Sequence, residues 1–149
     1  MVGRQYFLTG NHLSNLMMWD AIRAIDYLVS REEVDEARIG ITGCSGGGTL
    51  VTHILAADER IRVAEPVCFV TTARRIFEEL NGPTTQTGDP EQVPVGMLDF
   101  GIEHADLLLP FAPRPLQIEA AKRDYSSVVG TRETYAELKR MYGLLAAGS

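Results

Sequence analysis

The stretch that decides the fold is Arg38-Ile39-Gly40-Ile41-Thr42-Gly43-Cys44-Ser45-Gly46-Gly47, which a helix-like segment from Gly48 to Ala57 follows. The apolar, β-branched residues before Gly43 predict a strand, and the G-x-S-x-G pattern of residues 43–47 predicts a tight turn into the helix. In this strand–turn–helix context the pattern is typical of a nucleophile elbow, in which a serine is held at the tip of a strained turn. We expect Gly43 and Gly47 to remove a collision between the side chains on either side of Ser45.

The chemistry of such a turn gives its residues separate roles. Ser45 would stand at the positive end of the following helix, and the N–H of Gly46 could donate to an oxyanion. The alternative is a glycine-rich turn that only joins strand and helix, or one that cradles a phosphate. Neither G-x-x-x-x-G-K-[ST] nor G-x-G-x-x-G is present, which favours the elbow.

Length and composition indicate one globular domain over residues 1–149. Of these residues 45% are hydrophobic and 23% are charged, which is enough to build a core. The net charge of −6 and the pI near 5.0 argue against nucleic acid or an anionic membrane as a partner. No apolar run approaches the ~20 residues that span a bilayer, and the first residues lack the features of a secretory signal. We therefore expect a cytoplasmic protein.

The two cysteines fit a reducing compartment, because a secreted chain of this size more often carries a set of disulfides. Cys44 lies beside the candidate nucleophile, and Cys68 lies on the next predicted strand. We expect both to be small buried residues.

Hydrophobic periodicity predicts alternating helices and strands with one irregular segment, residues 81–95. An amphipathic helix over residues 13–29 carries apolar residues at 17, 18, 21, 22, 25, 28 and 29. Further helices are expected over residues 47–57, 72–80, 105–111 and 128–144. Strands are expected over residues 38–42, 62–70 and 116–120. This order predicts a parallel three-stranded sheet with right-handed crossovers.

Several segments together resemble the middle of an α/β-hydrolase, in particular the acetyl xylan esterase and dienelactone hydrolase-like branch. They are Trp19-Asp20-Ala21-Ile22-Arg23-Ala24-Ile25-Asp26-Tyr27-Leu28, Arg31-Glu32-Glu33-Val34-Asp35, residues 38–43, Ala57-Asp58-Glu59-Arg60-Ile61, Pro66-Val67-Cys68-Phe69, Ala112-Pro113-Arg114-Pro115-Leu116 and Gly130-Thr131-Arg132-Glu133-Thr134-Tyr135. The resemblance covers most of the chain outside about residues 81–100. It implies a partial α/β-hydrolase fold of three layers, with a small parallel β-sheet and flanking helices.

The resemblance also implies a Ser–acid–His order along the chain. Asp124 falls where this family places the acid, just past the strand after the irregular segment, and Glu119 is the reserve. The alternative for Asp124 is an exposed loop aspartate paired with a nearby Lys or Arg. Relatives carry earlier strands with a second oxyanion donor, and a last strand with the catalytic histidine beyond it. We expect this chain to begin inside the fold and to end short of that strand.

No histidine follows Asp124, and each of the three in the chain is a poor base for Ser45. His53 lies eight residues along the helix that starts at the turn, roughly 12 Å from Ser45 along the axis. His104 opens a short helix, where a capping or surface role is expected, and His12 precedes the first long helix. Their spacing matches no metal-ligand pattern, and no cofactor is implied.

The sequence therefore predicts part of a serine esterase, with Ser45, Gly46 and Asp124 as its site and a small-molecule ester as substrate, such as an acetylated carbohydrate. One alternative is a catalytically inactive remnant that serves as an oligomerising or binding module. Another is an oligomeric enzyme whose base, His12 or His104, comes from a second chain. Because a small parallel sheet leaves open edges, we expect a homo-oligomer, a symmetric dimer.

Overall fold

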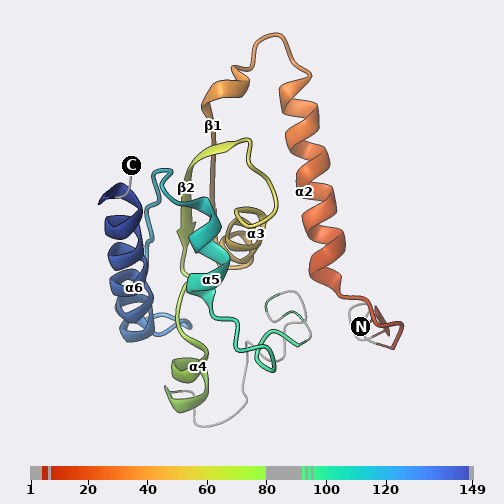
Figure 1. Ribbon diagram of the computed structural model, residues 1–149. Coiled ribbons are helices and arrows are strands. Elements are labelled where there is room, and N and C mark those ends of the chain that lie inside the picture. The colour runs from red at the N-terminus through yellow and green to blue at the C-terminus, as the bar shows by residue number, and fades with distance from the viewer. Residues whose placement is uncertain (1–4, 7, 80–91, 93, 95, 148–149) are drawn as a thin grey trace.

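The computed structural model describes residues 5–6, 8–79, 92, 94 and 96–147 (Figure 1). Its elements follow in the order α2 (Leu13–Val29), η1 (Glu36–Arg38), β1 (Ile39–Cys44), α3 (Gly46–Ile54), β2 (Ile61–Val67), α4 (Ala73–Glu79), α5 (His104–Leu108), η3 (Leu109–Phe111) and α6 (Val128–Ala147). The predicted helices are all present, although α3 ends three residues earlier than expected. Most of the expected irregular segment, residues 81–95, lies outside the described residues.

The sheet is parallel but smaller than the sequence predicts. β1 and β2 pair from Ile39↔Ile61 to Cys44↔Val67, with a register shift after Ile39. The third predicted strand joins β2 only through two isolated parallel bridges, Ala64–Leu116 and Val67–Glu119. Prolines at positions 113 and 115 lack the N–H groups that a regular ladder needs, which limits how far this segment can pair.

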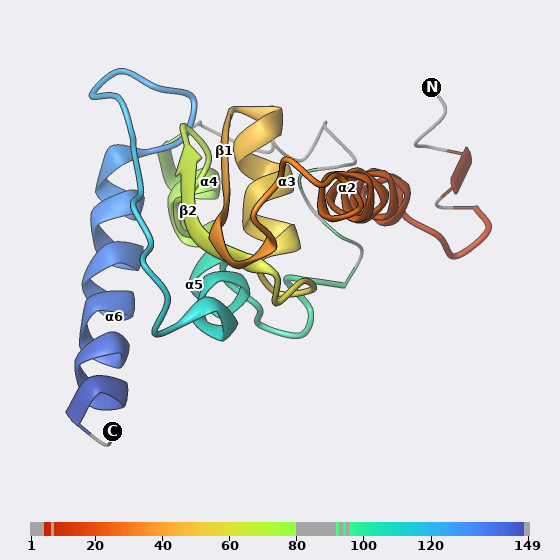
Figure 2. The same cartoon turned by 90° about the horizontal axis from the view of Figure 1, so that it is seen from above.

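In Figure 2, α3 and α2 lie to one side of the paired strands and α6 lies to the other. α3 contacts both strands, and α2 and α5 pack against α3. The core lies between α3 and the sheet and includes Val51 and Ile54 of α3, Leu55 directly after this helix, and Ile61 and Ala64 of β2.

The α/β fold with a small parallel sheet and flanking helices is confirmed. On the face of the sheet away from α3, Gly40, Thr42 and Gln117 are exposed, Glu65 is half-buried, and Val63 is 50% exposed.

Helix α2 has the predicted limits but buries only Ser14 and Ile25 fully. Leu28, expected in the apolar stripe, is 43% exposed, because the helix meets the body of the molecule mainly through α3. A charged network adds a second attachment. Arg60, next to β2, binds Asp26 of α2 at 2.6 Å and Asp58 at 2.5 Å. None of the described helices is long and apolar enough to cross a membrane.

The turn between β1 and α3 depends on glycine at two positions. A Cβ on Gly43 would lie 2.7 Å from the carbonyl group of Gly47, and one on Gly48 would lie 2.5 Å from the carbonyl oxygen of Val67. A Cβ on Gly47 would meet nothing within 4 Å. The expected collision therefore holds for Gly43 and is wrong for Gly47, because the space there is open. Gly48, which the sequence did not single out, lets α3 approach β2.

We predict that Gly48→Ala lowers the free energy of unfolding by about 1 to 3 kcal/mol, because the added methyl group overlaps backbone that cannot move away easily. The matched control, Gly47→Ala, should leave this free energy unchanged or raise it by up to about 1 kcal/mol, because alanine favours a helix. Urea unfolding followed by circular dichroism measures both. Equal effects of the two substitutions would contradict the close approach at Gly48.

Candidate active site

Ser45 occupies the turn between β1 and α3 in a strained backbone conformation. Its φ of 56° and ψ of −117° lie where non-glycine residues are rare, and the side chain is exposed. The Ser45 N–H donates to the carbonyl oxygen of Val67 at 3.0 Å, and the carbonyl oxygen of Ser45 accepts from the N–H of Thr49 at 2.9 Å. The Ser45 hydroxyl makes no capping bond to α3. The backbone is thus fixed at both ends while the hydroxyl is presented at the start of the helix.

Gly46 is the first residue of α3, so the helix offers no carbonyl one turn earlier to accept its N–H. An anion near Ser45 would also meet the positive end of the helix dipole. This arrangement is suited to stabilise negative charge that develops on an oxygen bonded to Ser45.

Asp124 is half-buried in the loop before α6 and lines the same cavity as Ser45. The cavity measures about 180 Å³. Its lining residues are Ser45, Cys68, Phe69, Gln92, Asp124, Tyr125 and Ser126. The structure therefore brings together the serine and the acid that the sequence nominates, from positions 79 residues apart.

The surroundings of Asp124 keep its carboxylate ionised. Partial burial raises its pKa, but hydrogen bonds outweigh this effect and lower the pKa below its usual value. The donors are the thiol of Cys68 and the backbone N–H groups of Tyr125, Ala121 and Ser126. The Tyr125 N–H lies 2.7 Å from Oδ1. An ionised, oriented carboxylate is what is needed to hold a histidine base.

The start of α6 holds this loop against the segment after β2. The Thr131 hydroxyl donates to the carbonyl oxygen of Val70 at 2.6 Å, and the Thr134 hydroxyl donates to that of Thr71 at 3.2 Å. The Thr71 hydroxyl in turn donates to the carbonyl oxygen of Ser127 at 3.1 Å. The position of Asp124 is therefore fixed by threonines that sequence reasoning did not single out.

Glu119, the reserve acid, does not reach the cavity of Ser45. It is exposed and accepts a hydrogen bond from Gln117 at 2.9 Å. Cys68 does line the cavity, and only its place on the predicted second strand could have indicated its contact with Asp124. The expectation that both cysteines are buried is wrong, because Cys44 is exposed and Cys68 is half-buried.

His53 and His104 both contact Phe69, and His12 lies near His53. His53 meets the edge of the Phe69 ring with centroids 6.3 Å apart, and His104 stacks on Phe69 at 4.5 Å. The Nδ1 of His104 accepts from the N–H of Thr71 at 3.1 Å. His12 caps the N-terminus of α2, where its Nδ1 accepts from the N–H of Ser14. All three are buried, so the expected surface role of His104 is wrong.

Burial keeps this cluster neutral. It lowers the pKa of His53 to about 4, with a further contribution from nearby His12. It also lowers the pKa of His104 to about 4, with a further contribution from His53. The Nε2 of His53 is buried, and in the described part of the chain it has no hydrogen-bond partner. None of the three histidines lines the cavity of Ser45.

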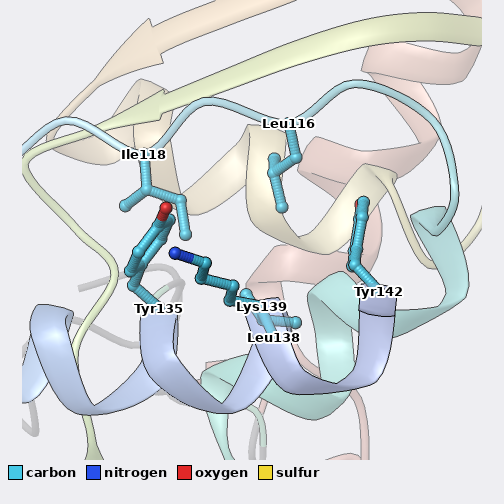
Figure 3. A pocket seen from close by; sticks show the side chains of 6 residues that line it. All are labelled: Leu116, Ile118, Tyr135, Leu138, Lys139 and Tyr142. Carbon is cyan, nitrogen blue, oxygen red and sulfur yellow. The ribbon is translucent and has the colours of Figure 1, made fainter. Parts of the chain in front are cut away.

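A second hollow of about 190 Å³ lies between α6 and the segment that bridges to β2 (Figure 3). Tyr135, Lys139 and Tyr142 extend from α6 toward Leu116 and Ile118. Its walls contain no nucleophile with a neighbouring carboxylate, in contrast to the cavity of Ser45.

The chain has a parallel sheet flanked by helices, with a strained serine at the turn from β1 to α3 and an acid in the same cavity. These features define the class of protein. The chain is an α/β-hydrolase. The sequence model of the prolyl oligopeptidase family matches residues 8–97, and the chain belongs to that family. The narrower acetyl xylan esterase and dienelactone hydrolase-like branch stays a prediction.

Known proteins share both sequence and fold with this chain. YtaP of Bacillus subtilis (strain 168), named as a hydrolase, is 37% identical over 65 residues, which are 44% of this chain and 22% of YtaP. A glucuronoyl esterase from Solibacter usitatus matches with a TM-score of 0.75 and 22% identity, over 91% of this chain and 37% of that one. The glucuronoyl esterase catalytic domain from Hypocrea jecorina matches with a TM-score of 0.71 and 20% identity, over 89% of this chain and 42% of that one. The chain thus spans less than half the length of each relative.

The lowered pKa values of His53 and His104 predict that acid destabilises the fold. Between pH 6.5 and about 4 the unfolded chain binds more protons than the folded one, so the free energy of unfolding falls as the pH drops through this range. The decrease in the free energy of unfolding approaches about 3 kcal/mol for each histidine. Urea unfolding at a series of pH values measures it.

The control is His104→Asn, because an asparagine oxygen can accept the N–H of Thr71 but does not titrate. In this variant the free energy of unfolding should fall less steeply between pH 7 and 5. An unchanged dependence on pH would show that His104 is not buried as a neutral base.

Proposed function

We propose that this chain carries the nucleophile and acid of a serine hydrolase that cleaves carboxylic esters. The observation that supports the proposal best is Ser45 itself, a non-glycine residue at positive φ with an exposed hydroxyl that shares a cavity with an ionised Asp124. Such strain persists only where the surrounding structure enforces it, and it is concentrated at functional sites.

In the proposed reaction the Oγ of Ser45 attacks the ester carbonyl while a base takes its proton. The oxyanion of the tetrahedral intermediate accepts the N–H of Gly46, and the alcohol then leaves with the proton. In a second step a water molecule attacks the acyl-enzyme and releases the acid from Ser45. Asp124 would orient the base, which has to come from outside these 149 residues, because the three histidines are buried elsewhere.

We further propose an ester of a carbohydrate as the substrate, an acetylated sugar being the simplest case. The support is the fold shared with two proteins that are named glucuronoyl esterases. The proposal concerns a whole protein of which this chain would supply the Ser45 site.

The other candidate function is a catalytically inactive module that uses the fold for binding or oligomerisation. The burial of all three histidines favours it, because Ser45 without a base is a weak nucleophile. The alternative that His12 or His104 serves a second chain is not supported, because both are buried within their own chain.

We predict that the chain alone hydrolyses p-nitrophenyl acetate barely above background. A missing triad histidine costs on the order of 10⁶ in turnover, and a missing oxyanion donor costs a further ~10² to 10³. Added imidazole, which can stand in for the absent side chain, should raise hydrolysis above the rate of Ser45→Ala in the same buffer. Asp124→Asn should reduce that difference.

Subtracting the rate measured with Ser45→Ala removes the hydrolysis that imidazole catalyses by itself in solution. A rate in imidazole that is equal for the wild type and Ser45→Ala would favour the inactive module. Turnover well above background that survives Ser45→Ala would place the chemistry elsewhere.

We also propose that the chain self-associates. The segment at residues 116–119 pairs with β2 on one side only, and α6 leaves Val129, Tyr135 and Leu144 between 40% and 59% exposed. Sedimentation velocity at tens of micromolar (~10 to 50) should show a dimer. A compact monomer throughout this range would refute the proposal.

A further inference from the structure

The two cysteines of the chain lie side by side at the ends of the two paired strands. Cys44 is the last residue of β1 and pairs with Val67, and Cys68 follows Val67 directly. Adjacent strands lie about 4.8 Å apart and rise about 3.3 Å per residue, which puts the two Cα atoms roughly 6 Å apart. This separation is the usual one for a disulfide.

The backbone of Cys68 supports the same conclusion. In a regular strand Cys68 would point away from the face that Val67 and Cys44 share. Its φ of 55°, unusual for a non-glycine residue, breaks that alternation. A hydrogen bond to the carboxylate of Asp124 raises the pKa of the Cys68 thiol, and nearby Cys44 raises it further, so both groups lie close to this sulfur.

The two cysteines differ in their exposure to solvent. Cys44 is exposed, so small molecules in solution can reach its sulfur. Cys68 is half-buried in the cavity of Ser45, and its hydrogen bond to Asp124 and its partial burial raise its pKa to about 11. Attack by a thiolate is the first step of thiol–disulfide exchange, so the exposed sulfur reacts first.

We propose that Cys44 and Cys68 form a redox modification site, at which a small disulfide converts the two thiols to a reversible intrachain disulfide. The Cys44 thiolate attacks the small disulfide, which gives a mixed disulfide and releases one small thiol. Cys68 then loses its proton to water and attacks the sulfur of Cys44, which releases the second small thiol. The two cysteines are oxidised by two electrons in total, and the small disulfide is reduced by two.

The modification changes the site proposed above, and this consequence rests on the proposed function. A Cys68 in a disulfide has no S–H to donate, so Asp124 loses one of the hydrogen bonds that hold its carboxylate. The disulfide would also attach Cys44, the residue next to Ser45, to the end of β2 through Cys68. We expect oxidation to lower any reaction that depends on Ser45 and Asp124.

The test incubates the reduced full chain with oxidised glutathione and analyses it by mass spectrometry. The wild type should lose both free thiols and gain no glutathione, and its digest should contain a peptide that links residues 44 and 68. Cys68→Ser should retain one glutathione on Cys44, because nothing displaces it. A reductant should restore both thiols in the wild type.

A stable glutathione adduct on Cys44 of the wild type, or a disulfide only between two chains, would overturn the proposal. The masses of the chain and its peptides do not depend on catalysis, so this experiment tests the redox site separately from the proposed hydrolase function. If the intrachain disulfide forms and no Ser45-dependent hydrolysis exists in either redox state, the redox site stands and the proposed function fails.

Discussion

The structure depends on the close approach of α3 to β2 at the turn that contains Ser45. Gly48 brings the helix against the carbonyl oxygen of Val67, and the same carbonyl accepts the N–H of Ser45. This contact fixes the helix over the sheet and forces Ser45 into a conformation that non-glycine residues rarely adopt. The strain is offset by the burial of Val51 and Ile54 on the same helix and of Leu55 directly after it.

A consequence of this turn is a separation between residues that face the cavity and residues that stabilise the core. Ser45 and Asp124 line a cavity of about 180 Å³, whereas His53 and His104 pack against Phe69 and do not line it. A neutral, buried histidine stabilises the fold at neutral pH, but it cannot reach a proton on Ser45. The chain thus combines a strained, exposed serine turn with histidines that are buried in the core.

The sequence predicted the elements with strong periodicity and the turn with a known pattern. It placed α2 and α6 closely and put Ser45 at the strand–helix junction, because glycine spacing and apolar alternation are local signals. It could not predict contacts set by packing between distant segments. Examples are the space beside Gly47, the closeness of Gly48 to Val67, the exposure of Cys44 and the meeting of the three histidines. The third strand, predicted over residues 116–120, forms only two isolated bridges, because the prolines next to it lack the N–H groups of a regular ladder.

The most direct test of the account is to find which side chain in the cavity reacts as the nucleophile. The chain would be treated with a small fluorophosphonate in imidazole buffer, digested, and mapped by mass spectrometry. The phosphonyl group should be found on Ser45, and Asp124→Asn should slow its addition. Labelling of Tyr125 or Ser126, which also bring hydroxyl groups to the cavity, with Ser45 unmodified would contradict this assignment.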